Sequence, residues 1–260
     1  MSYLINPYMV SASGISDEKL AVYWKFNEAS SPILNSSQSS DSIGNTSSTG
    51  QGAMTGGSFE QTGRTGAGEI PTTAVLFDGT DDSMQAGSTA SLWNFWSNTD
   101  ALWTMAFWMK GVDLGWDDYF LANTDGTQDQ GLRIRLDGQT TYSGFNFMLR
   151  SDGNSILNAS SSTTFIPDLN WHFYCFSYDM SLGSDNLVIR RDNANEETIS
   201  KSGGTTADGD ADYVPTMAKK TGGSANYGNF LIGEYSIWNK VMSDDDQTAL
   251  YNSGLGLEIY

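Results

Sequence analysis

The only histidine and the only cysteine of the chain are the first residues to consider for catalytic chemistry. His172 and Cys175 lie three positions apart in a stretch that alternates like a β-strand. Successive strand side chains point to opposite faces, so this odd offset excludes a local Cys-His dyad. A Ser-His-Asp site would need His172 from the middle of a strand, and the sequence has no Gly-x-Ser-x-Gly turn to present a nucleophile. Nucleophilic catalysis therefore has no support in the sequence.

A second set of residues could bind a ligand without transforming it. Trp116, Asp117, Asp118 and Tyr119 follow one another in a predicted loop, and Trp96 lies before the clearest strand. Flat aromatic rings offer a stacking surface to the apolar faces of sugars, and neighbouring carboxylates accept hydrogen bonds from hydroxyl groups. We expect this set to form the ligand-binding site. Alternatively, the rings fold back onto the edge of the protein or lie against a neighbouring subunit.

Strands must position these residues, because the dominant periodicity of the sequence is two. In the clearest predicted strand, 102–109, Trp103, Met105, Phe107 and Met109 share one face. The opposite face is partly apolar too, as in a central strand. The other predicted strands are 20–26, 74–77, 119–122, 132–136, 145–149, 171–178, 187–190, 230–232 and 235–239. We therefore predict an all-β fold, a two-sheet antiparallel sandwich.

Two polar stretches and one helix complete the expected organisation. Residues 29–69 and 201–229 are rich in small polar residues and Gly, so we expect two long surface loops. A short C-terminal helix is predicted to begin after Ser243, which can cap it, and to stop at Gly254. The acidic run at 244–246 suits the positive end of the helix dipole, and we interpret it as structural.

Charge and composition exclude several classes of function. The chain has 260 residues and a formal net charge of -18, from 13 Lys+Arg against 31 Asp+Glu. This charge disfavours nucleic acid and anionic lipid as partners. No apolar run approaches about 18 residues, so no membrane insertion is expected. The first residues carry no features of a secretory signal peptide. With one cysteine, the chain cannot form an internal disulfide.

Several blocks of sequence resemble the laminin-G-like or concanavalin-A-like jelly roll of lectins, pentraxins and adhesive proteins. The blocks occur in the family's order: LAVYWKFNE at 20–28, VLFDGTDD at 75–82, LWTMAFWMK at 102–110, WHFYCFSYD at 171–179, IGEYSIWNKVMSD at 232–244 and ALYNSG at 249–254. The resemblance implies a jelly-roll domain over residues 15–260. These blocks are mostly strand and turn residues, so they say little about the ligand.

The resemblance also bears on a cofactor and on catalysis. Relatives of this fold often hold a structural Ca²⁺, and the matching positions here are Glu234 and Asp41, with backbone oxygens around Gly44 and Asp78. Alternatively, Asp41 caps a turn, Glu234 is merely exposed and Asp78 begins a tight turn. The β-glucan-cleaving relatives carry a Glu-x-Asp-x-x-Glu run, which this sequence lacks. We therefore expect no enzymatic activity.

An apolar arm at 1–14 precedes the predicted domain. Its side chains suit assembly with another protein or with further copies of the chain, and the residues concerned are Tyr3, Leu4, Ile5, Pro7 and Tyr8. An adhesive domain with such an arm resembles bacteriophage structural proteins. We expect a virion component, located at the particle surface, that contacts other virion proteins and host cell-surface glycans. The alternative is a free carbohydrate-binding module or lectin, assisted by Ca²⁺.

Overall fold

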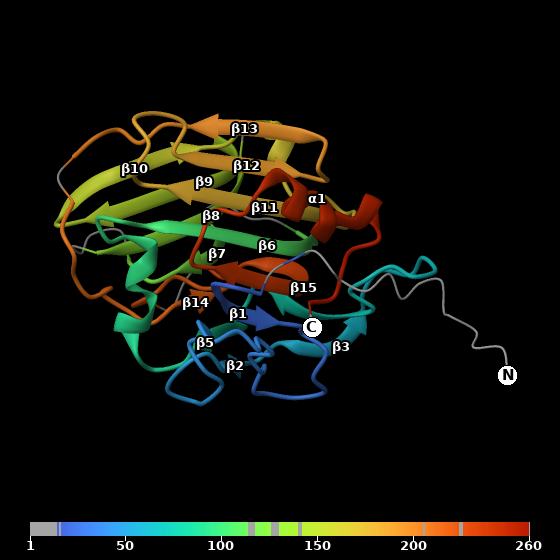
Figure 1. Cartoon of the computed structure of the whole chain (residues 1–260). Helices are drawn as coiled ribbons and strands as arrows, with labels where there is room; N and C mark the ends of the chain where they lie inside the picture. The colour runs from blue at the N-terminus through green and yellow to red at the C-terminus, as the bar shows by residue number, and fades with distance from the viewer. Residues whose placement is uncertain are drawn as a thin grey trace, which may run out of the picture.

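The computed structural model describes residues 15, 17–113, 118–125, 130–139, 142–204, 206–223 and 226–259, without the side chains of 137–139 and 142–143. Two antiparallel sheets stack face to face, which confirms the predicted all-β sandwich (Figure 1). The predicted arm 1–14 lies outside the described residues. Within the described residues, no helix is long and apolar enough to cross a membrane.

The larger sheet has eight strands. Seven of them run in the order β13-β12-β11-β6-β15-β4-β3, and β1 also pairs with β15. Their bounds are β1 (Leu20–Trp24), β3 (Ser58–Thr62), β4 (Thr73–Asp78), β6 (Leu102–Gly111), β11 (His172–Asp179), β12 (Leu187–Arg191), β13 (Asn195–Ile199) and β15 (Asn229–Trp238).

The smaller sheet has seven strands in the order β10-β9-β8-β7-β14-β5-β2. Their bounds are β2 (Gly52–Thr55), β5 (Ser83–Ala86), β7 (Asp118–Ala122), β8 (Gly131–Gln139), β9 (Tyr142–Ser151), β10 (Asn154–Ser160) and β14 (Thr216–Met217). Short 3-10 turns lie at η1 (Ala90–Trp96), η2 (Thr163–Phe165) and η3 (Asn252–Gly254), and the helix is α1 (Asp244–Tyr251).

Strand β6 divides the apolar side chains between two clusters. Trp103, Met105, Phe107 and Met109 lie in the core between the sheets, as the alternation of the sequence predicts. Trp108 faces the other way, into a second cluster on the outer face of the eight-stranded sheet. That cluster also contains Leu20, Tyr23, Ala106, Phe173, Cys175, Trp238, Met242, Leu250 and Ile259. Helix α1 and the C-terminal segment therefore cover part of this outer face.

The predicted surface loop at 29–69 is wrong in part. It contains β2 and β3, and an isolated bridge joins Ile33 to Gly52. Strand β3 lies at the edge of its sheet with alternately exposed residues, so it needs few apolar side chains and carries only a weak sequence signal. Likewise, the predicted loop at 201–229 contains the two-residue strand β14.

Two predicted boundaries also differ. The separate strands expected at 230–232 and 235–239 form one strand, β15, which continues through an irregularity at Gly233 and Glu234. Glu234 has a φ of 51° there, in the left-handed region. Ser243 caps α1 by accepting a hydrogen bond from the amide of Asp246, as predicted. The helix ends earlier than expected, because Asn252 takes the left-handed cap position with a φ of 48°.

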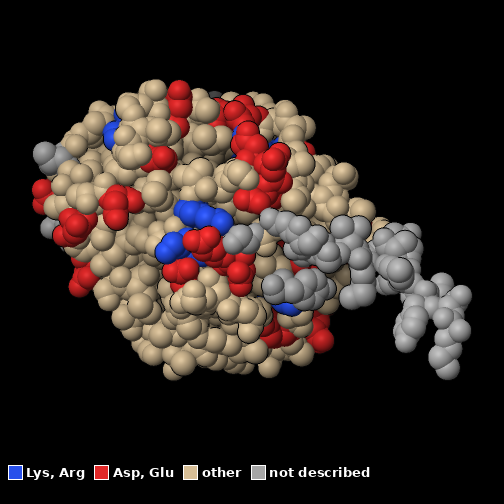
Figure 2. Space-filling view, viewed as in Figure 1, with Lys and Arg blue, Asp and Glu red and all other residues tan. Residues whose placement is uncertain are grey.

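The surface charge is unevenly distributed. Acidic side chains gather over α1, the helix that begins with three aspartates (Figure 2). Asp244 forms an ion pair with Arg190 at 2.8 Å, so one of these carboxylates also links α1 to β12. The run therefore has the structural role that its position at a helix N-terminus predicts.

Candidate functional site

The side chains expected to bind a ligand are largely buried. Trp96 is 0% exposed and its ring packs against Trp93 with centroids 4.9 Å apart. Tyr119 and Asp118 are 4% and 6% exposed. None of the three presents a surface to solvent, because folding back onto the sandwich removes the rings from water. The structure thus favours the alternative reading of this set, and Trp116 and Asp117 lie outside the described residues.

The residues expected to bind Ca²⁺ do not converge. Asp41 accepts hydrogen bonds from the amide and the ammonium of Lys19, just before β1. Glu234 lies beside Tyr23 and Lys25, at the other end of β1. Six residues of extended chain, from Lys19 to Lys25, span roughly 20 Å, and the ligands of one ion must lie within a few ångströms of each other.

The two remaining positions expected to bind Ca²⁺, Gly44 and Asp78, do not bring the donor set together. The carbonyl of Gly44 accepts a hydrogen bond from the side chain of Asn35 at 2.9 Å. Asp78 pairs with Asn229, five residues along β15 from Glu234. The donor set that the resemblance implies therefore does not fit one Ca²⁺.

Glu234 has a structural environment instead. Its carboxylate accepts a hydrogen bond from the hydroxyl of Tyr23, which in turn accepts one from the amide of Ile259 at 3.2 Å. Burial, more than any other factor, raises the pKa of Glu234 to about 7, and the nearby Glu258 adds to the rise. Lys25 forms an ion pair with Glu258. Glu234 thus helps to hold the C-terminal segment against β1.

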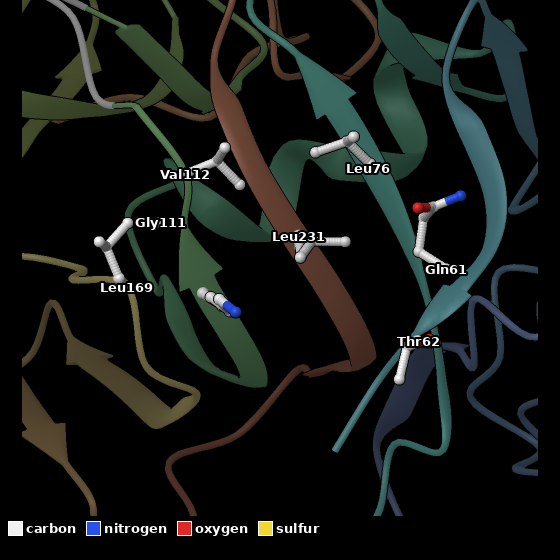
Figure 3. Close-up of a pocket in the computed structure, with 8 residues that line it drawn as sticks. Gln61, Thr62, Leu76, Gly111, Val112, Leu169 and Leu231 are labelled. Carbon is white, nitrogen blue, oxygen red and sulfur yellow. The ribbon is translucent and has the colours of Figure 1, made fainter. Parts of the chain in front are cut away.

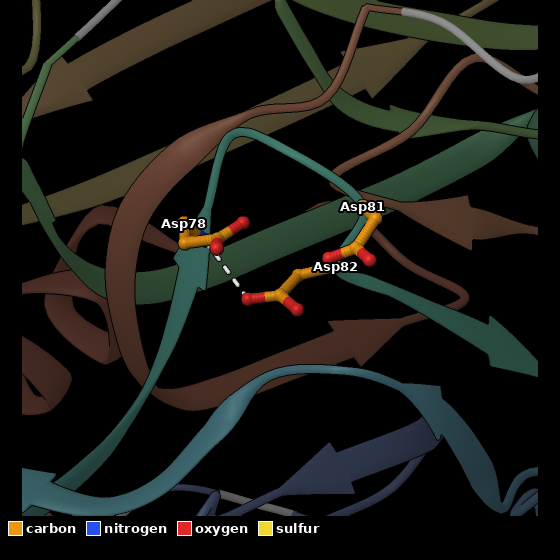
Figure 4. A group of neighbouring side chains, drawn as sticks. All are labelled: Asp78, Asp81 and Asp82. Carbon is orange, nitrogen blue, oxygen red and sulfur yellow. Dashed lines mark hydrogen bonds between the residues drawn. The ribbon is translucent and has the colours of Figure 1, made fainter.

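A carboxylate cluster lies at the turn between β4 and β5. One carboxylate oxygen from each of Asp78, Asp81 and Asp82 lies within 4.8 Å of the others (Figure 4). Asp82 already accepts hydrogen bonds from the amide of Asp78 at 3.0 Å and from the amide of Gly57 at 2.5 Å. The two carboxylate oxygens of Asp82 thus link this turn to the turn between β2 and β3, so Asp82 has a structural role.

A groove lies on the part of the eight-stranded sheet's outer face between β3 and β6. Eight residues line its larger hollow, which has a volume of about 460 Å³ (Figure 3). Leu76 and Leu231 project from the paired strands β4 and β15 and form an apolar floor, and Lys110 on β6 pairs with Leu231. The other lining residues are Gln61, Thr62, Gly111, Val112 and Leu169.

A second hollow of about 430 Å³ continues the groove. It shares Thr62 and Lys110 with the first and adds the half-buried ring of Trp171. Arg64 lines it too, with its guanidinium 3.8 Å from the centroid of the Trp108 ring and 3.0 Å from a carboxylate oxygen of Glu69. We refer to the two hollows together as the groove. It combines an aromatic edge, an apolar floor and a polar rim.

The segment before β11 forms one wall of the groove. Leu169 is 67% exposed there, and Asp168 and His172 frame the segment. The ring of His172 lies 2.5 Å from Asp192 and 3.1 Å from Asp168. Its hydrogen bond with Asp192 is the main reason that the pKa of His172 is raised. His172 therefore ties this wall to the turn after β12 and has a structural role.

Sequence reasoning missed this groove because its residues lie on ordinary strands. Leu76 and Leu231 occupy outward positions that resemble core positions in the sequence. The one sequence feature that could have indicated the groove is Lys110, a charged residue near the end of the apolar strand β6, on the face opposite Met105 and Phe107. The pairing of β6, β15 and β4, which brings the three positions into one row, is long-range and has no local signature.

A family model described as the concanavalin A-like lectin/glucanases superfamily matches residues 78–246. The chain belongs to this superfamily. That assignment confirms the resemblance seen in the sequence blocks and the jelly-roll fold. A comparison with curated protein sequences found no significant match.

Solved structures of the superfamily fold resemble the chain at low sequence identity. Domain 4 of the arabinanase AbnA from Geobacillus stearothermophilus, solved with arabinotriose, has a TM-score of 0.56 and 14% identity over 92% of this chain and 98% of that chain. The binding domain of botulinum neurotoxin DC, solved with SialylT, has a TM-score of 0.58 and 13% identity over 91% of this chain and 52% of that chain.

A third similar structure belongs to an enzyme. Trypanosoma rangeli sialidase, solved with sialic acid, has a TM-score of 0.57 and 10% identity over 92% of this chain. This chain covers only 34% of the length of the sialidase and about half of the length of the neurotoxin binding domain. At these identities the likeness concerns the fold alone.

Proposed function

We propose that the chain is a carbohydrate-binding domain that holds a glycan in the groove without cleaving it. The observation that carries this proposal is the continuous groove of two hollows, about 460 and 430 Å³, with Trp171 at its edge. Concave sites that join apolar surface to a few polar groups are typical of small-ligand binding. Two of the similar structures were solved with arabinotriose and with SialylT, which supports a saccharide as the ligand class.

The chemistry of the lining suits a sugar. Leu76 and Leu231 can pack against the C–H face of a pyranose or furanose ring, and Trp171 can add an aromatic surface. The amide of Gln61 and the hydroxyl of Thr62 can exchange hydrogen bonds with sugar hydroxyl groups. Because the floor is built on paired strands, these groups are fixed before the ligand arrives, which lowers the entropic cost of binding.

The charges of the lining support binding without hydrolysis. Glycoside hydrolysis uses two carboxyl groups on either side of the scissile bond. The described lining of the larger hollow has no Asp or Glu, and the second hollow has only Glu69, which is engaged with Arg64. Among the described residues of the groove, a bound sugar would therefore meet no pair of carboxyl groups.

The finer prediction, a virion component, rests on the arm. Tyr3, Leu4, Ile5, Pro7 and Tyr8 lie outside the described residues, and no described contact bears on particle assembly. The virion role stays a prediction, and the carbohydrate-binding alternative is the one that the described geometry supports.

Glycan binding by two groove variants tests the proposal. Full-length protein is screened against immobilised neutral and acidic glycans, and the best ligand is then titrated by calorimetry. We expect Leu231→Gln and Trp171→Ala each to weaken binding by roughly tenfold, because each loses apolar contact with the sugar.

A matched substitution controls for nonspecific effects. Leu182→Gln alters a leucine that is 44% exposed in the turn after β11, away from the groove, and should bind like the wild type. Thermal unfolding identifies any variant that loses binding because it fails to fold. Wild-type affinity in both well-folded groove variants would overturn the assignment of the groove.

A further inference from the structure

Among the described residues, Lys110 is the only charged one that lines the larger hollow. Within the described part of the chain, its ammonium has no hydrogen bond and no ion pair, and the residue is half-buried. Three other cations in this sheet or next to its strands are paired: Lys19 with Asp41, Lys25 with Glu258 and Arg190 with Asp244. In a chain with a net charge of -18, an unneutralised cation at the centre of a groove is an exception.

The carboxylates around the groove do not serve as partners for Lys110. Glu69 is held by Arg64 at 3.0 Å. Asp168 lies 3.1 Å from His172 and also accepts hydrogen bonds from Asn170. Glu60 precedes the lining residue Gln61 in the sequence and Asp113 follows Val112, but both are exposed and neither lines a hollow. In the part of the groove that the structure describes, one positive charge is therefore available beside an apolar floor.

This combination specifies the chemistry of the ligand. The aliphatic stem of Lys110 lies in one row with Leu231 and Leu76, so its ammonium meets a ligand that already covers these leucines. A small inorganic anion would leave the leucines uncovered, and a neutral sugar would leave the ammonium unpaired. A saccharide with an acidic substituent satisfies both.

We propose that the groove selects glycans that carry a carboxylate or sulfate group, with Lys110 as the residue that binds this group. The inference rests on the proposed function, since it names the class of glycan that the groove would hold. The negative charge of the whole molecule does not prevent such binding, because charges farther away than about 8 Å are largely screened at physiological ionic strength.

Titration of full-length protein with matched probes tests the selection. The probes are hexagalacturonate and its methyl ester for the carboxylate, and a κ-carrageenan oligosaccharide and its desulfated form for the sulfate. At 150 mM NaCl, we expect at least one acidic probe to bind roughly tenfold more tightly than its uncharged counterpart. A preference confined to one pair identifies which acidic group the groove takes.

Lysine variants assign the preference to a residue. Lys110→Gln should remove it while leaving weaker binding of the uncharged probe, and Lys110→Arg should retain much of it. Lys240→Gln, an equal change of charge beyond the opposite end of β15, should leave it unchanged.

Three results would count against the inference, and they are distinguishable. Equal binding of charged and uncharged probes overturns the selection but leaves the carbohydrate-binding function standing. A preference that survives Lys110→Gln overturns the role of Lys110. Failure of every glycan, neutral or acidic, to bind well-folded wild-type protein overturns the proposed function and the inference with it.

Discussion

At the scale of single residues, burial decides what a side chain can do. Trp96 and Tyr119 have the residue types of a sugar platform, but they are buried and contribute to packing. Trp171 begins a strand that the sequence predicts, and it packs against the outer cluster while it also lines the groove. Residue type in the sequence indicated which rings could stack on a ligand. Only the three-dimensional environment separates the rings that are covered from those that are accessible.

Glu234 makes the stability of the fold depend on pH. Its pKa in the folded protein is about 7, against an ordinary value of 4.5, so the folded state binds the proton more tightly than the unfolded state. This contribution to stability is fully present below pH 4.5 and is lost as the pH rises through about 7. Between pH 5 and pH 8 the wild type should lose on the order of 2 kcal/mol of unfolding free energy through this residue, and Glu234→Gln should not show that loss. Urea unfolding at both pH values measures the difference.

An exposed glutamate provides the comparison for this variant. Glu60→Gln removes the same charge at an exposed position of β3 and should follow the wild-type pH profile. If Glu234→Gln also follows the wild-type profile, the carboxyl of Glu234 does not stay protonated in the folded protein near neutral pH.

At the scale of elements, the long central strands could be predicted, whereas short strands and edge strands could not. Alternation along β6 puts Trp103 and Phe107 on the face that packs in the core. The opposite face of this strand is covered too, so the whole strand is apolar and easy to recognise in the sequence. Strand β3 lies at a sheet edge and has little to bury, and β14 lies between β7 and β5 but has only two residues, so both resemble loops in the sequence. The groove escaped prediction for a related reason. It depends on which strands are neighbours, and β4, β6 and β15 are far apart in the sequence.

Asp82 connects two turns, and its removal should destabilise the sandwich. In Asp82→Ala the amides of Gly57 and Asp78 lose their common acceptor, so we expect unfolding to become easier by about 2–4 kcal/mol. Asp81→Asn, at an exposed position of the same turn, should cost less than about 0.5 kcal/mol. Chemical unfolding of the three proteins measures the difference.

The same experiment separates a hydrogen-bonding role from a bound cation. The destabilisation of Asp82→Ala should be equal in EDTA and in millimolar CaCl₂, because backbone amides cause it. A difference that disappears in EDTA would show instead that the cluster of Asp78, Asp81 and Asp82 stabilises the wild type by holding an ion.

At the scale of the whole molecule, the C-terminal segment closes a second apolar cluster. Ile259 is 8% exposed within this cluster, and its amide donates to Tyr23 on β1. The segment thus joins the two ends of the described fold. Removal of residues 257–260 should lower the free energy of unfolding by about 2–4 kcal/mol, from lost apolar burial and two polar contacts.

The truncation should also change the pH dependence of stability. Without Glu258 and the covering segment, the pKa of Glu234 should fall towards its ordinary value, because burial and Glu258 both raise it. The stability loss between pH 5 and pH 8 should therefore shrink along with total stability. A truncated protein with wild-type stability would show that the segment does not pack on β1 in solution.

The row of Lys110, Leu231 and Leu76 has a consequence for how this domain can diversify. Each residue points outward from a strand whose neighbouring positions, such as Met109, Phe230, Ile232, Val75 and Phe77, lie in the core. The outward-facing residues can therefore be exchanged, in evolution or in a randomised library, while the core residues maintain the fold. A few codons at alternate positions would suffice to retarget the surface to another saccharide.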